Sequence, residues 1–137
     1  MKQILIRNGK VKLEEVPDVI LEERKVVVKV LHSCISSGTE LAGVKSSGEP
    51  LWRKAIRQPL QVKKVIDTSF EIGISKTANL VKSKISSANP TGYSAAGYVL
   101  KVGKGIKDLS VGDRVACAGA GIANHAELIS VPRNLLC

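Results

Sequence analysis

Apolar positions in the first third of the chain follow the spacing of β-strands. An apolar run at residues 2–7 is followed by an Asn8-Gly9 turn, and residues 11–16 alternate apolar and charged side chains with a period of two. Residues 26–31 form a valine-rich, β-branched run of the kind that buried strands need. We therefore predict a hairpin and a buried strand, followed by a loop that ends near Thr39.

The last third of the chain shows the same kind of pattern. Residues 97–103 predict a strand, a turn-rich crossover spans 104–113, and residues 114–118 and 126–131 predict two further strands. Pro132 then stops the last strand, because proline has no amide hydrogen to donate to a sheet. Both ends of the chain therefore contribute to one mostly β domain.

The middle of the chain has a different spacing of apolar residues. From Leu51 to about Ile85, apolar residues recur every three or four positions, with lysines and arginines between them. This spacing predicts two basic amphipathic helices, broken near Pro59 and again near Gly73. The predicted fold class is therefore mostly β (α+β), with a helical insertion over about residues 45–88. Because each helix has an apolar face, we also expect the chain to form a homo-oligomer.

The net charge of +9 is concentrated in this insertion. Residues 45–84 hold nine lysines and arginines against three acidic residues, a net charge of +6. Two uses stay open: a solvated helical face that covers this domain or another one, and a site for phosphate, a nucleotide-sugar diphosphate or an acidic membrane surface. Only four residues of the chain are aromatic, too few for a base-stacking platform, so we expect no nucleic-acid partner.

Composition also predicts the compartment. No apolar run reaches the ~20 residues of a membrane-spanning helix, and the N-terminal residues do not form a signal peptide. Cys34, Cys117 and Cys137 form no C-x-x-C pair and are odd in number, which argues against a disulfide framework. These features predict a cytoplasmic protein with no membrane span. The cysteine and histidine counts alone leave room for one zinc ion.

Residues 119–124 come close to the G-x-G-x-x-G fingerprint of dinucleotide-binding folds. Asn124 stands where the third glycine belongs, and a strand rather than a helix is predicted next. We interpret the segment as a structural loop, and no other stretch has a dinucleotide-fold or P-loop pattern. We therefore expect no NAD or NADP to be bound by this chain alone.

A family resemblance rests on five motifs that occur in the family's order: residues 36–40, 92–99, 102–103, 111–115 and 123–132. Together they resemble the N-terminal, GroES-like catalytic domain of the medium-chain alcohol dehydrogenase superfamily, over residues 1–45 and 88–137. The resemblance implies a partly open β-barrel that forms the substrate side of an oxidoreductase dependent on NAD or NADP. It also implies that the nucleotide-binding Rossmann domain lies outside this chain, which alone would be inactive.

Some sequence segments resemble one branch of that superfamily in particular. Residues 35–40, 92–97 and 115–121, with the insertion that contains Arg57-Gln58-Pro59, are similar to a bacterial bi-domain branch. In that branch the dehydrogenase half is fused to a Gfo/Idh/MocA-type oxidoreductase, often encoded among surface-polysaccharide genes. The similarity implies a link to sugar or surface-polysaccharide metabolism, and a longer protein with Rossmann and C-terminal domains.

The sequence departs from the zinc-dependent members at the metal ligands. Those members carry a cysteine directly before Gly-Thr-Asp/Glu and a Gly-His-Glu before the next strand, because Zn²⁺ prefers thiolate and imidazole ligands. Here Ser37 takes the cysteine position, and Tyr93 and Ser94 take the His-Glu positions. Cys34 lies three residues too early to substitute, and Cys117 stands alone where other members have a four-cysteine zinc lobe. We therefore expect a zinc-independent type with no metal site.

Three hydroxyl residues, Ser37, Thr39 and Tyr93, are the candidate catalytic residues. By resemblance, Thr39 occupies the position that relays a proton from the substrate oxygen, and Tyr93 could donate a hydrogen bond or a proton to a carbonyl. Alternatively, Thr39 caps the following helix with Ser37 in the same turn, and Tyr93 packs as a half-buried ring. Glu40 matches a carboxylate behind the site, and we expect it and both histidines, His32 and His125, to be structural.

Two functions follow from these expectations. In the first, hydride passes between a nicotinamide held by the Rossmann domain and a small-molecule carbonyl or alcohol near the three hydroxyl residues. In the second, the chain is a non-catalytic GroES-like binding or assembly module whose basic helices dock an anionic partner. The family resemblance favours the first.

Overall fold

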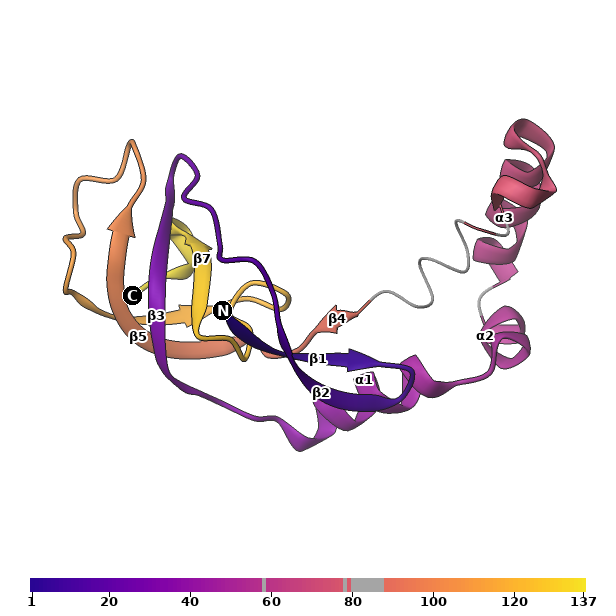
Figure 1. The fold of residues 1–137 in the computed structure, drawn as a ribbon, viewed down its shortest axis with the longest axis horizontal. Helices are drawn as coiled ribbons and strands as arrows, with labels where there is room; N and C mark the ends of the chain where they lie inside the picture. The colour runs from indigo at the N-terminus through magenta and orange to yellow at the C-terminus, as the bar shows by residue number, and fades with distance from the viewer. Residues whose placement is uncertain (58, 78, 80–87) are drawn as a thin grey trace.

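The structure is a computed structural model that describes residues 1–57, 59–77, 79 and 88–137. Within these ranges the chain folds into two antiparallel sheets, with helices inserted between the first strands and the last ones (Figure 1). The strands of the larger sheet curve around the hydrophobic core, the smaller sheet lies to one side, and the two do not close into a barrel. This arrangement confirms the predicted fold class, an α+β domain that is mostly β and partly open.

The smaller sheet has the strand order β2-β1-β4, and the larger one β6-β5-β3-β7. The strands of the smaller sheet are β1 (Lys2–Arg7), β2 (Lys10–Glu15) and β4 (Asn89–Pro90). Those of the larger sheet are β3 (Lys25–Ser33), β5 (Ser94–Val102), β6 (Arg114–Ala118) and β7 (Leu128–Pro132). Every strand that the sequence predicts is present, and β1 and β6 have the predicted bounds.

The hairpin of β1 and β2 turns where the sequence predicts. Asn8 and Gly9 both have positive φ angles, 51° and 73°, which matches the right-handed twist of the two strands. The alternation in β2 does predict a strand, but its apolar side chains are not buried. Val11 and Leu13 lie on the same face of β2 and both stay exposed.

The hydrophobic core lies on the larger sheet. Val26 and Val28 of β3 pack with Val99 of β5 and Val131 of β7, and all four side chains are fully buried. Cys117 of β6 belongs to the same cluster, and burial, followed by the charge of Cys137, raises the pKa of its thiol to about 11. Cys117 is therefore a protonated core residue at neutral pH.

The helices are α1 (Ser37–Gly48), α2 (Leu51–Arg57) and α3 (Pro59–Ile72), and a short 3₁₀ turn, η1, spans Arg133–Leu135. The predicted breaks near Pro59 and Gly73 are confirmed, since α3 begins at the proline and ends before the glycine. The loop prediction for residues 37–39 is wrong, because the serine before them caps a helix that starts at once. The predicted helical pattern beyond residue 79 falls outside the described residues.

Helices α2 and α3, which we call the helical arm, lie apart from the larger sheet. Figure 1 shows the arm beyond the turn of the β1–β2 hairpin, whereas α1 lies along that hairpin. Consequently the apolar side chains of the arm remain in solvent: Trp52 is 61% exposed and Phe70 is 85% exposed. The arm is thus no cover for the larger sheet, although its helical period is the predicted one.

Candidate active site

The first turn of α1 fixes the hydroxyl of Thr39. Ser36, in an extended conformation, is the N-cap: its Oγ accepts a hydrogen bond from the Thr39 amide at 3.5 Å. The same Ser36 hydroxyl donates to Thr39 Oγ1 at 3.2 Å. The alternative in which Thr39 itself caps the helix is therefore wrong. Because Thr39 Oγ1 accepts from Ser36, its own proton remains available for another acceptor.

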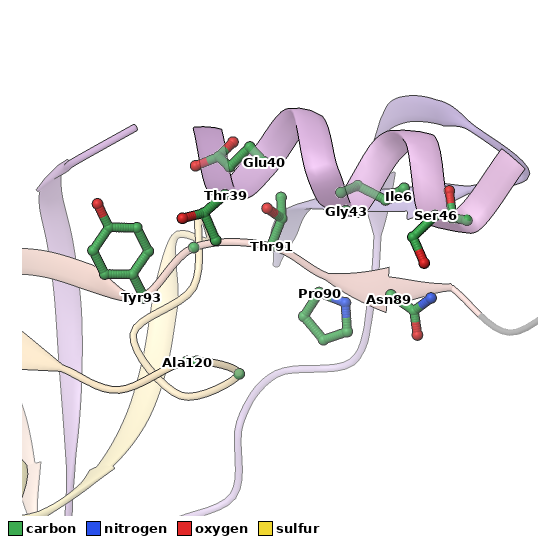
Figure 2. Close-up of a pocket in the computed structure, with 13 residues that line it drawn as sticks. Ile6, Thr39, Glu40, Gly43, Ser46, Asn89, Pro90, Thr91, Tyr93 and Ala120 are labelled. Carbon is green, nitrogen blue, oxygen red and sulfur yellow. The ribbon is translucent and has the colours of Figure 1, made fainter. Parts of the chain in front are cut away.

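A cavity of about 350 Å³ lies between α1 and the segment that enters β5 (Figure 2). One wall is a single face of α1, because residues spaced by three or four positions lie above one another on a helix. The lining residues of this wall are Thr39, Glu40, Gly43, Ser46 and Ser47. The remaining lining residues are Ile6, next to Gly43, together with Ala120, Gly121 and residues 89–93.

Tyr93 reaches this cavity through an unusual backbone. Gly92 has a φ of 108°, and a Cβ at this position would come within 2.7 Å of the His125 amide nitrogen. The chain therefore passes close to the loop before β7 and places the half-buried Tyr93 ring at the cavity. Figure 2 shows this ring next to Thr39, at the end of the cavity where α1 begins.

The structure thus brings together two of the three candidate catalytic residues. Thr39 and Tyr93, 54 positions apart in the sequence, line the same cavity. Ser37 is exposed in the first turn of α1 and does not line the cavity. Ser46, at the far end of the same helix face, lines the cavity and was not predicted from the sequence.

A buried histidine joins α1 to the rest of the domain. His125 Nε2 lies 2.7 Å from Glu40 Oε1, and His125 Nδ1 lies 2.8 Å from Ser33 Oγ. The His125 side chain is only 4% exposed and that of Glu40 19%. The His125 backbone also accepts from the Ile4 amide at 2.8 Å and donates to the Thr91 carbonyl at 2.8 Å. One residue therefore links α1, β1, β3 and the segment before Tyr93.

No sequence signal predicts the Glu40–His125 pair. The two residues are 85 positions apart, and neither belongs to a spaced motif with the other. The family resemblance implies that Glu40 stands behind the site, whereas the structure has Glu40 among the residues that line the cavity. Both ring nitrogens of His125 have partners, as expected of a structural histidine. His32, by contrast, is exposed on β3.

Neither a metal nor a dinucleotide has an evident site in the part of the chain that the structure describes. Within residues 1–57, 59–77, 79 and 88–137, no three His, Cys, Asp or Glu side chains come together as metal ligands. Residues 119–124 form turns that lead towards β7, which confirms that this glycine-rich segment is a loop without a following helix. Among the described helices, none is both long and apolar enough to cross a membrane.

Comparison with known proteins identifies the fold. No family model and no curated protein matches the chain. Solved structures do: it is similar to a quinone oxidoreductase from Coxiella burnetii (TM-score 0.64, 15% identity), over all of this chain and 36% of that one. It is also similar to galactitol-1-phosphate dehydrogenase from Escherichia coli, with a TM-score of 0.63 and 20% sequence identity. That match covers all of this chain and 37% of the dehydrogenase.

A third neighbour is the Escherichia coli quinone oxidoreductase complexed with NADPH (TM-score 0.61, 15% identity, all of this chain and 32% of that one). The chain therefore spans about a third of the length of the solved structures it matches. At these identities the likeness shows a shared fold. It confirms that the chain folds like the corresponding part of oxidoreductases that include a member of the alcohol dehydrogenase superfamily.

Proposed function

We propose that this chain is the substrate-side domain of an NAD(P)-dependent oxidoreductase of the medium-chain, zinc-independent type. The observation that carries the proposal is the cavity lined by both Thr39 and Tyr93, in a fold shared with quinone oxidoreductases and a polyol phosphate dehydrogenase. The reaction is the interconversion of a small-molecule carbonyl and an alcohol. The three candidate catalytic residues have unequal support, because Ser37 does not line the cavity.

The chain's own residues bind and protonate the substrate oxygen. Thr39 Oγ1 accepts from Ser36, so its proton can be donated to a carbonyl oxygen placed in the cavity. The phenol of Tyr93, at the same end of the cavity, is the second donor and the acid that protonates the oxygen as the carbonyl is reduced. In the reverse direction the deprotonated Tyr93 oxygen takes back the single alcohol proton as hydride leaves, and Thr39 keeps its hydrogen bond to the substrate oxygen.

The described residues do not themselves fit NAD or NADP. The one glycine-rich turn, residues 119–121, has no helix after it to direct amide groups at a pyrophosphate. We therefore assign the cofactor to a Rossmann domain outside this sequence, consistent with a chain that spans about a third of its structural neighbours. Zinc is not part of the proposal, since Ser37 and Tyr93 stand at the ligand positions.

The cellular setting is part of the same proposal. The similarity of residues 35–40, 92–97 and 115–121 to the bi-domain branch suggests a cytoplasmic enzyme of sugar or surface-polysaccharide metabolism, with a Gfo/Idh/MocA-type C-terminal half. A polyol phosphate dehydrogenase among the structural neighbours is consistent with a sugar-like substrate.

A second candidate function is supported by the helical arm. The arm is exposed and basic, and none of its described residues lines the cavity of Thr39 and Tyr93, which suits a non-catalytic module that docks an anionic partner. The two functions differ in what Thr39 and Tyr93 do. They carry the reaction in the first and have no role in the second.

The experiment is a comparison of variants in the full-length gene product. NADPH-dependent reduction of carbonyl and quinone substrates is measured for Tyr93→Phe, Thr39→Val and Ser37→Ala. We expect the first two to lower kcat by about 10²-fold or more, because each removes a proton donor, and Ser37→Ala to stay within about 3-fold. Equal kcat values for wild type, Tyr93→Phe and Thr39→Val would overturn the assignment, and absence of any activity would favour the docking module.

A further inference from the structure

A second cavity opens at the other end of α1. It has a volume of about 830 Å³ and lies between the C-terminal half of α1 and the start of the helical arm. Its lining residues are Ala42, Lys45, Ser46, Gly48, Glu49, Pro50, Arg53 and Arg57. Ser46 lines both cavities, so the two adjoin along one helix.

The charges around this second cavity favour an anion. Three cations, Lys45, Arg53 and Arg57, line it together with a single carboxylate, that of Glu49. Glu49 Oε1 lies 3.5 Å from Arg57 Nη1, so one cation is already partly neutralised. Among the described residues, Lys45 and Arg53 form no ion pair with an acidic group. A net positive hollow of this kind attracts a compact anion.

The guanidinium groups are suited to phosphate in particular. Arginine presents a planar fork of N–H donors that matches two oxygens of a phosphate. Arg53 is further held by its position over the Trp52 ring, with the guanidinium carbon 5.0 Å from the ring centroid. Lys45, in the last turn of α1, adds a third cationic group to the two arginines of α2. Two elements of the fold thus converge on one anion.

The first cavity runs along α1 from Thr39 to Ser46, where the second cavity adjoins it, and this distance sets the length of the ligand. Thr39 and Ser46 are seven residues apart on one helix, which corresponds to about 10 Å along its axis. An extended sugar phosphate has about this length from its carbonyl carbon to its outer phosphate oxygens. A ligand whose carbonyl lies beside Thr39 and Tyr93 would therefore place its phosphate at Ser46, among Lys45 and Arg53.

We propose that the second cavity is the phosphate subsite of the substrate: the enzyme acts on a phosphorylated polyol or sugar. The carbonyl or alcohol occupies the cavity of Thr39 and Tyr93, and the phosphate is bound by Lys45, Arg53 and Arg57. The identity of the substrate rests on the proposed function, whereas binding of phosphate does not. The two are therefore separable by experiment.

The first test measures phosphate binding to this chain without any reaction. Inorganic phosphate and glucose 6-phosphate are titrated at low ionic strength and followed by NMR shifts of the amides of residues 45–57. We expect saturable binding that is weakened at least 5-fold by Arg53→Gln and by Lys45→Gln. Lys63→Gln and Lys64→Gln are the matched controls, because they remove the same charge from exposed positions on α3 that do not line the cavity.

Three outcomes would contradict the subsite. The first is an absence of saturable binding, and the second is an equal loss of affinity in all four variants, which would indicate general attraction by the arm. The third is tighter binding of an RNA oligomer that weakens in the α3 controls as well, which would identify the arm as a polyanion-binding surface. Binding of phosphate that weakens only in Arg53→Gln and Lys45→Gln supports the proposal.

The second test uses the full-length gene product and separates this inference from the proposed function. Arg53→Gln should raise KM at least 5-fold for a phosphorylated substrate, leave kcat within 2-fold, and leave KM for an unphosphorylated analogue unchanged. If no substrate reacts but phosphate still binds at Arg53, the proposed function fails and the subsite stands. If the enzyme is active and Arg53→Gln does not change KM, the subsite fails and the function stands.

Discussion

The larger sheet and the helical arm use apolar side chains in opposite ways. In the larger sheet Val26, Val28 and Val131 are fully buried between strands that are far apart in the sequence. In the arm Trp52 and Phe70 follow a regular helical period, yet both stay mostly in solvent. Both patterns predict secondary structure correctly. Only the first also predicts burial, because burial depends on whether a second surface exists to cover the apolar face.

This contrast explains where the stability of the domain should reside. A β-branched side chain in the larger sheet contacts neighbours from several strands, so a change there is transmitted to the whole core. A side chain of the arm contacts few other residues, so it can change without cost to the sheets. The contrast can be tested by making the same kind of substitution at a tightly packed position and at an exposed one, and comparing the effects on stability.

The largest effect is expected at the contact between β3 and β5. A methyl group at Gly97 would overlap the carbonyl oxygen of Lys29 on the neighbouring strand. Because the overlap involves backbone on both sides, Gly97→Ala should lower the free energy of unfolding by about 3 kcal/mol or more. Urea denaturation followed by circular dichroism measures this change.

The control is a glycine with open space around it. A Cβ at Gly38, in the first turn of α1, would have no neighbour within 4 Å. Gly38→Ala should therefore leave the stability unchanged or raise it by up to about 1 kcal/mol. If Gly97→Ala proves no more harmful than Gly38→Ala, β3 and β5 are not packed as tightly as the structure has them.

The fold was largely predictable because most elements carry local signals. The β-branched run of β3, the Asn8-Gly9 turn and the Pro59 break each predict a structure from a few adjacent residues. The start of α1 was not predicted, because Ser37 and Gly38 are poor helix formers. The helix begins there because the Ser36 side chain caps it. The exposure of the arm was not predictable either, since it depends on tertiary placement.

A smaller effect is expected where α1 is joined to the domain. Removing one partner from the Glu40–His125 pair leaves the other buried without its hydrogen bond. His125→Ala should therefore cost about 1–3 kcal/mol, and the cycle with Glu40→Ala should give a coupling of about 0.5–3 kcal/mol. The unfolding free energies of the four proteins give the coupling directly.

His32→Ala is the matched control, because His32 is exposed on β3 and should change stability by no more than about 0.5 kcal/mol. If His125→Ala is as mild as His32→Ala, the pair does not hold α1 in place.

The candidate site was only partly predictable for the same physical reason. Thr39 and Tyr93 were proposed through a family resemblance, and the structure places both at one cavity. Ser46 and the Glu40–His125 pair depend on how α1 lies against residues 89–93, and no spacing within the sequence encodes that contact. Sequence patterns predict chemistry along one element well, and they predict poorly what two distant elements form together.

The smallest effect on stability is expected in the arm, where the effect on association should be large. Trp52, Ile56 and Val65 are all exposed, so replacing the three by serine should change the unfolding free energy of the sheets by no more than about 0.5 kcal/mol per site. An exposed apolar surface of this kind favours contact with a second copy, so we expect the wild-type chain to dimerise through the arm. Sedimentation velocity should then show the triple variant shifted towards monomer while the β signal in circular dichroism is kept.

Val11→Ser with Leu13→Ser removes exposed apolar surface from β2 instead and should leave the dimer intact. A wild-type chain that sediments as a clean monomer would rule out this role for the arm, and dissociation by the β2 variant would move the interface to the hairpin.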